Sequence, residues 1–199
     1  MISKKHLISL LLALSFAAGA SAQDFTFGLK GGIAANWMPG TYLDLYDVAQ
    51  TNVGFYAGAT GALNLDGSFF PQVEVLFARK GVTTNNELTG KYSRNISYVQ
   101  VPVYAGFKLA DDRFRIMLGP EFGFCVGQNI RTKYETPAIV GKPAPFNFAF
   151  AIQATYMIAD FLGVDAKFDY GITRTLQDAL NDNGRNMSLQ IGLCVVFGD

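Results

Sequence analysis

The sequence predicts an all-β fold: one eight-stranded antiparallel up-and-down barrel. Three observations predict it. Apolar and polar residues alternate with a period of two in eight segments, and the connections between these segments differ sharply in length. No stretch after residue 22 approaches the roughly 18 consecutive apolar residues of a membrane-spanning helix. If the mature chain crosses a bilayer, it must therefore cross with strands.

The N-terminus has the three parts of a secretory signal peptide. Lys4 and Lys5 supply positive charge, an apolar run extends from Leu7 to Ala18, and small residues precede a cleavage site after Ala22. The apolar run is too short to span a bilayer as a helix. We expect residues 1–22 to be removed on export and residues 23–199 to form one barrel domain.

Composition excludes some functions and favours a lipid-facing wall. Charged residues make up 16% of the chain, whereas soluble domains carry roughly 25%. Without the two lysines of the signal peptide, the formal net charge falls from zero to about −2. No basic field of the kind that binds nucleic acid is present, so we expect no nucleic-acid partner.

Counting the alternation gives eight predicted strands. They are Phe25 to Ala35, Val53 to Leu63, Phe69 to Thr83, Ser97 to Leu109, Arg113 to Val126, Asn147 to Ile158, Leu162 to Ile172, and Met187 to Phe197. An even number is what single-chain bacterial membrane barrels require.

The connections fall into two classes. The tight turns are Asn64 to Ser68, Ala110 to Asp112, and Ala159 to Phe161. The long connections are Asn36 to Asn52, Thr84 to Ile96, Gly127 to Phe146, and Thr173 to Asn186. Membrane barrels have short periplasmic turns and long outer loops, so we expect both termini on the periplasmic side.

The two faces of each strand decide between a soluble and a membrane barrel. In the fourth segment Val99, Val101 and Val103 share one face, and Tyr98 and Gln100 share the other. A soluble barrel of the lipocalin type has the same strands with the polar face outside. Here the polar faces are rich in glycine, which suits the crowded inside of a narrow barrel. The sequence thus favours a transmembrane barrel.

Pro102 and Pro120 fall in neighbouring predicted strands at similar heights. Proline cannot donate a ladder hydrogen bond, and a closed barrel has no free edge to receive it. We expect a bulge or a local gap between these strands.

Several motifs resemble those of the small outer-membrane β-barrel domain family that includes PorT-like proteins, often labelled "porin family". They are Phe27-Gly28-Leu29-Lys30-Gly31-Gly32, Gly54-Phe55-Tyr56-Ala57-Gly58, Gln72-Val73-Glu74 followed by Lys80-Gly81, Val101-Pro102, Gly119-Pro120, and Tyr170-Gly171-Ile172-Thr173. The resemblance implies a bacterial outer-membrane barrel and, as partners, the barrel-assembly machinery and membrane lipid. One departure is the end, because Phe197 is followed by Gly198-Asp199 instead of closing the chain.

No constellation for catalysis is present. The single histidine, His6, lies in the predicted signal peptide, so a serine or water nucleophile would lack the usual base. Cys125 and Cys194 are the only soft metal ligands. We therefore expect no enzyme activity, no metal and no cofactor. The predicted heights of Cys125 and Cys194 along the barrel axis differ by roughly 20 Å, which is too far for a disulfide bond between them.

Charged residues on the predicted inner faces form the candidate site. They are Lys30, Glu74, Lys108, Arg115, Glu121, Asp165, Lys167 and Asp169. Four positive and four negative groups in a narrow barrel predict an internal salt-bridge network that fills the lumen. A pore tuned for one ion sign would carry an excess of one charge.

The long connections are the candidate binding surface. Trp37, Tyr42 and Tyr46 in the first are more apolar than solvent favours, which suits contact with a protein partner or lipopolysaccharide. The third contains Arg131 and Lys142, a set that suits either lipid phosphates or plain solvation. We expect a plugged barrel with a structural or surface-binding role. The alternative is a narrow transporter for a small or hydrophobic solute.

Overall fold

Eight strands close into a barrel in the computed structural model, which describes residues 25–38, 48–65, 67–86, 90–110, 112–132, 142–177 and 184–197. The wall strands are β1 (Phe25–Trp37), β3 (Asn52–Leu63), β4 (Phe69–Asn86), β5 (Gly90–Leu109), β6 (Phe114–Thr132), β8 (Phe146–Ala159), β9 (Leu162–Arg174) and β11 (Arg185–Phe197). Their order, β4-β3-β1-β11-β9-β8-β6-β5, returns to β4 with antiparallel pairing throughout. The predicted eight-stranded barrel is confirmed. The predicted signal peptide lies outside the described residues.

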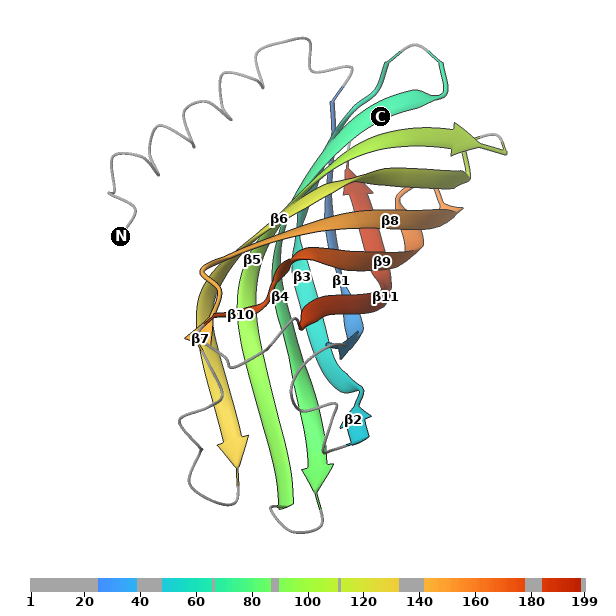
Figure 1. Cartoon of the computed structure of the whole chain (residues 1–199). Helices are drawn as coiled ribbons and strands as arrows, with labels where there is room; N and C mark the ends of the chain where they lie inside the picture. The colour runs from blue at the N-terminus through green and yellow to red at the C-terminus, as the bar shows by residue number, and fades with distance from the viewer. Residues whose placement is uncertain are drawn as a thin grey trace.

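The two ends of the barrel differ in length. The three predicted tight turns lie toward the upper right of Figure 1, and the long β4–β5 hairpin points downward with β6 beside it. Gly67 has a φ of +105° in the first turn, a conformation that glycine adopts without steric cost. Three short strands lie at the other end: β2 (Val48–Gln50), which pairs with β4, and β7 (Lys142–Pro143), which pairs with β10 (Leu176–Gln177).

Two predicted loops are largely strand. Residues 84–86 and 90–96 extend the β4–β5 hairpin, and residues 127–132 extend β6. Most residues of these segments are polar in the sequence. Because apolar and polar residues do not alternate in these segments, the period-two pattern does not predict them as strands.

The prolines interrupt the ladders as expected. The β4–β5 pairing passes from Val73↔Val103 directly to Leu76↔Gln100, so no bridge forms at Pro102. The β5–β6 pairing likewise passes from Pro102↔Glu121 to Ala105↔Leu118, which leaves Pro120 unbridged to β5. The predicted local gap is confirmed, and the register on either side of it is unchanged.

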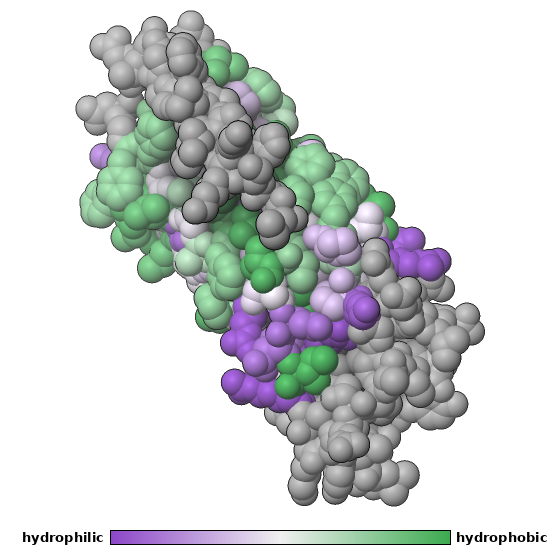
Figure 2. All heavy atoms as spheres, turned by 90° about the vertical axis from the view of Figure 1, so that its left-hand side faces the viewer, coloured by the Kyte–Doolittle hydropathy of each residue, from purple (hydrophilic) through white to green (hydrophobic). Residues whose placement is uncertain are grey.

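The outer face of the wall is apolar. Ile33, Val53, Ile152 and Phe161 are each at least half exposed, and many other Phe, Leu and Val side chains share this face. Figure 2 shows a broad hydrophobic surface next to a hydrophilic patch at the long-connection end. The prediction of apolar outer faces is confirmed, and the reversed, soluble arrangement is excluded. Among the described residues, no helix is long and apolar enough to cross a membrane.

Candidate functional site

Charged side chains converge inside the barrel from four strands. Lys30 comes from β1, Glu74 and Lys80 from β4, Glu121 from β6, and Asp165, Lys167 and Asp169 from β9. All seven are at most 5% exposed. Each strand turns alternate residues inward, so the spacing of these residues along their strands places them on one face. We call these seven residues the lumen network.

Lys30 is the centre of the first half of the network. Its Nζ lies 3.2 Å from Glu74 Oε1 and 3.2 Å from Asp165 Oδ2, and it donates to Gln153 Oε1 at 2.8 Å. Gln72 Nε2 donates to the same Glu74 oxygen at 2.8 Å. One ammonium group thus faces two carboxylates and an amide oxygen.

The second half joins two lysines and two carboxylates. Lys80 Nζ lies 2.6 Å from Asp169 Oδ1 and 3.4 Å from Glu121 Oε1. Lys167 Nζ lies 2.7 Å from Glu121 Oε2. Gln100 Nε2 also donates to Glu121 Oε1. Glu121 is therefore bridged by both lysines and an amide.

These contacts cross the lumen instead of following neighbouring strands. β3 separates β1 from β4, β11 separates β1 from β9, and β8 separates β6 from β9. Each of the ion pairs within the network joins strands that are not hydrogen-bonded to each other. Lys80–Asp169 joins opposite sides of the barrel, and the other pairs bridge strands two apart. Buried charges are costly unless they are paired, so these contacts tie non-adjacent strands together.

Glycines make room for one long side chain that reaches the network. Tyr56, Gly32, Gly192 and Asp165 are successive partners across β3, β1, β11 and β9. The Tyr56 hydroxyl donates to Asp165 Oδ2 at 2.8 Å, so its side chain spans the two glycines. A Cβ on Gly192 would collide with the Tyr56 hydroxyl. The absence of a side chain at Gly192 is what allows the contact.

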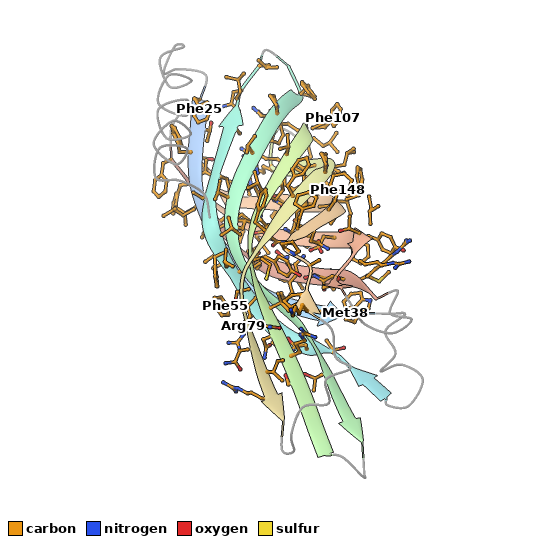
Figure 3. All side chains as sticks on the ribbon, turned by 60° about the vertical axis from the view of Figure 1, so that its left-hand side comes forward. Phe25, Met38, Phe55, Arg79, Phe107 and Phe148 are labelled. Carbon is orange, nitrogen blue, oxygen red and sulfur yellow. The ribbon has the colours of Figure 1, made fainter. Side chains whose placement is uncertain are left out.

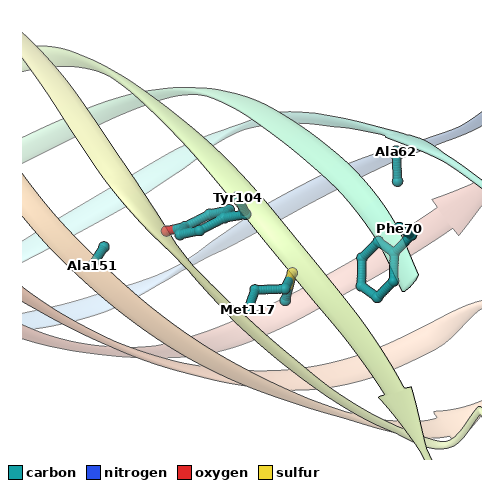
Figure 4. Close-up of a cluster of buried hydrophobic side chains, with 5 residues drawn as sticks. All are labelled: Ala62, Phe70, Tyr104, Met117 and Ala151. Atoms are coloured by element: carbon teal, nitrogen blue, oxygen red, sulfur yellow. The ribbon is translucent and has the colours of Figure 1, made fainter. Parts of the chain in front are cut away.

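Apolar side chains lie on both sides of the network. Toward the short turns, Ala62, Phe70, Tyr104, Met117 and Ala151 form a buried cluster inside the barrel (Figure 4). Toward the long connections, Met38, Ile96 and Tyr98 form a second buried cluster. The Phe70 ring also covers Gly106, its cross-strand partner. Apolar clusters thus lie on both sides of the lumen network, and the long-connection side also contains the buried polar side chains of Asn36 and Arg94.

The structure places the predicted inner charges in two groups. Six belong to the lumen network, and they are Lys30, Glu74, Glu121, Asp165, Lys167 and Asp169. The other two lie near the short turns. Lys108 Nζ is 3.7 Å from Asp112 Oδ2, and the Arg115 guanidinium lies 5.9 Å from the centre of the Phe70 ring.

Sequence reasoning missed one network member. Lys80 is absent from the predicted inner charges, although it shares the even-numbered face of β4 with Glu74 and Gln72. The alternation along this strand was the signal that could have placed it inside.

The predicted loop surface is described only in part. Trp37 is the last residue of β1 and half-buried, and its Nε1 donates to Met187 Sδ at 3.0 Å. Tyr42 and Tyr46 lie outside the described residues. Arg131, predicted in a loop, belongs to β6.

Within the described part of the chain, no group of three or more His, Cys, Asp or Glu side chains is placed to hold a metal ion. Cys125 and Cys194 are free thiols on β6 and β11, strands that do not pair with each other.

Comparison with known proteins places this architecture among outer-membrane barrels. A family model described as "Outer membrane protein beta-barrel domain" matches residues 11–177. A comparison with curated proteins gives no match.

Three solved structures illustrate the likeness of fold. The outer membrane protein OprG of Pseudomonas aeruginosa matches with a TM-score of 0.53 and 14% identity, over 89% of this chain and 98% of that one. Neisserial surface protein A (NspA) matches with a TM-score of 0.53 and 14% identity, over 90% of this chain and 99% of that one. Ail, the attachment invasion locus protein of Yersinia pestis, matches with a TM-score of 0.52 and 13% identity, over 87% of this chain and 99% of that one. At such identities the likeness concerns the fold alone.

Proposed function

This chain belongs to the outer membrane protein beta-barrel domain family, and from that premise we propose that it is a plugged, non-enzymatic barrel with a structural or surface-binding role. Its strands anchor it in the bacterial outer membrane. The lumen network closes the interior, and the long connections carry any contact with a partner.

One observation carries the proposal of a closed lumen: the ion pairs cross the barrel at its middle. Eight strands enclose an interior only just wide enough for side chains. Here Lys30, Lys80 and Lys167 extend across that interior to carboxylates on non-adjacent strands. A dissolved ion would have to break these pairs to pass.

The long-connection end supports the binding role. Two connections meet there, because β7 pairs with β10 through Pro143↔Leu176 and Lys142↔Gln177. A strand pair between loops holds them in a defined arrangement, which a recognition surface needs. Ail was crystallised in complex with the heparin analogue sucrose octasulfate, so a barrel of this fold can bind a ligand.

We propose that both termini and the short turns face the periplasm. The support is the asymmetry of the two ends, since membrane barrels keep short turns on the periplasmic side and long connections outside. Single cysteines in a Cys125→Ser, Cys194→Ser background test it. On intact cells, an impermeant maleimide should label Asn129→Cys and leave Gly67→Cys unlabelled. The reverse pattern would contradict this orientation.

Planar-bilayer recording of the purified whole barrel tests the closed lumen. We expect no stable, reproducible conductance steps from the parent protein. A Lys80→Ala, Glu121→Ala double variant removes the central crossing and should conduct more often, while Lys108→Ala, near the short turns, should behave as the parent. Regular conductance steps in the parent would contradict the closed lumen.

The alternative function is transport of a small or hydrophobic solute, and one observation favours it. Several buried polar atoms inside the barrel lack a hydrogen-bond partner among the described residues, including the Tyr104 hydroxyl, Asp165 Oδ1 and Gln190 Oε1. Such atoms are usually satisfied by water. A hydrated path along them is what this alternative requires, and the same conductance recording distinguishes the two functions.

A further inference from the structure

A groove lies on the outer wall where the hydrophobic surface meets the polar patch. It has a volume of about 440 Å³ and is lined by residues of β3, β4, β5 and β6. Phe55 and Phe77 form its apolar part, with ring centres 5.9 Å apart, and both are at least 40% exposed. Figure 3 shows Phe55 and Arg79 side by side on this part of the wall, far from Phe25 and Phe107 at the other end.

A β-bulge shapes the groove. The β5–β6 pairing shifts between Ser97↔Gly127 and Tyr98↔Cys125, so Val126 is the extra residue on β6. A bulge bends its strand and increases the local twist. Phe124 and Val126 are exposed before the shift, and residues 127–129 and Arg131 are all exposed after it. The bulge thereby brings an apolar and a polar set of side chains to one concave surface.

The polar part of the groove is cationic. Arg79 and Arg131 both line it, together with the side-chain amides of Asn95 and Asn129. The described residues that line it include no carboxylate, and neither arginine takes part in the salt bridges found in the described part of the chain. Guanidinium groups bind phosphate oxygens in a planar, two-pronged geometry.

We propose that this groove binds the phosphorylated headgroup of a membrane lipid, with an acyl chain along Phe55 and Phe77. The polarity of the surface argues for a lipid over a soluble anion or a protein. The aromatic part continues along β3 and β4 into the exposed apolar residues Val53, Val75 and Val73, and the cationic part lies beside the exposed polar residues of β6. A lipid with an anionic headgroup and an apolar acyl chain would place its headgroup at the arginines and its chain along the phenylalanines. The inference rests on the membrane placement proposed above.

The test is native mass spectrometry of the whole barrel in dodecylmaltoside, titrated with bis-phosphorylated lipid A. Dephosphorylated lipid A and inorganic phosphate are separate arms. We expect saturable binding of lipid A, binding at least tenfold weaker after dephosphorylation, and no binding of phosphate alone. Arg79→Gln and Arg131→Gln should each weaken lipid A binding about tenfold, because each removes a charge-assisted contact. Arg79→Lys should retain part of the affinity.

Arg174→Gln is the matched control. Arg174 is an exposed arginine at the long-connection end of β9, which β8 separates from β6. The Arg174→Gln substitution should leave lipid A binding unchanged. Each variant must also be folded, which is checked by the shift of its electrophoretic band on heating. Equal loss in all three glutamine variants, equal binding of the dephosphorylated lipid, or binding of phosphate alone would overturn the inference. These results are independent of the conductance recording, so the groove and the closed lumen can fail separately.

Discussion

The middle of the lumen and its short-turn end contain the same kinds of charged residue in very different surroundings. At the middle, Lys167 and Glu121 lie 2.7 Å apart with side chains 0% and 1% exposed. At the short-turn end, Lys108 and Asp112 lie 3.7 Å apart, and the Asp112 side chain is 66% exposed. The comparison teaches that the position of a charge along the strand, and not only the face it occupies, decides what it contributes to stability.

The physical reason is desolvation. Removing one partner of a buried ion pair leaves an uncompensated charge away from water, which destabilises by about 3–5 kcal/mol. An exposed pair contributes about 0–1 kcal/mol, because water and salt screen it and both side chains lose freedom in forming it. Glu121→Ala and Lys108→Ala test the two sides of this contrast, and two further substitutions test the packing beside the buried network; they follow from the largest expected effect to the smallest.

Glu121→Ala should have the largest effect. It leaves both Lys80 and Lys167 without their shared carboxylate, and we expect the free energy of unfolding to fall by about 3–5 kcal/mol. Denaturant unfolding of barrels refolded into lipid vesicles measures it. Asp112→Asn serves as the control, since it removes the exposed charge and keeps a side chain that tolerates the φ of +65° at this position. Equal losses of stability in the two variants would show that buried and exposed charges contribute equally to the stability of this barrel.

Gly192→Ala should destabilise the barrel by about 1–3 kcal/mol through overpacking. The new methyl group would meet the Tyr56 hydroxyl and the backbone of Gly31. The same unfolding experiment measures the loss. Gly127→Ala is the matched control, because a Cβ there meets nothing within 4 Å and the position is exposed. An unchanged stability of Gly192→Ala would show that Tyr56 does not cross this glycine.

Tyr56→Phe should cost about 1 kcal/mol, because it removes a single hydrogen bond to Asp165 and keeps the ring. Asp165 retains its contact with Lys30, so no charge is left unpaired. Combining Tyr56→Phe with Gly192→Ala gives a double-mutant cycle, in which we expect a smaller loss than the sum of the two single losses. Strict additivity would mean that the hydroxyl and the glycine do not interact.

Lys108→Ala should have the smallest effect, between about 0 and 1 kcal/mol. Its partner Asp112 is largely exposed, and high salt should shrink even this loss. Thermal melts at low and high ionic strength check the prediction. A loss as large as that of Glu121→Ala would show that Lys108 belongs to the lumen network after all.

Alternation along the strands predicted much of this structure. It located all eight wall strands, separated the apolar outer faces from the polar inner ones, and assigned Glu74, Glu121 and Asp169 to the interior. The backbone chemistry of proline predicted the interruption at Pro102 and Pro120. These features depend on local rules of geometry, and a single sequence contains enough information to apply them.

Other features depend on the height and pairing of distant strands. The period of two says that Lys108 faces inward, but it does not say that the residue lies at the open end near Asp112. The bulge at Val126 shifts the pairing register of the rest of β6 by one residue, and no residue type there indicates it. Arg131 therefore belongs to an outer-wall groove that alternation, continued from Phe124, would have turned inward.

The ion pair between Lys30 and Asp165 has a consequence for how the barrel assembles. Its residues come from β1 and β9, and β11 lies between these strands, on the seam where the first and last wall strands of the chain meet. The pair cannot form until that seam closes, so before then both charges remain hydrated and the edges of β1 and β11 remain unpaired. Closing the seam between β1 and β11 therefore both pairs the last two strand edges and removes these two charges from water.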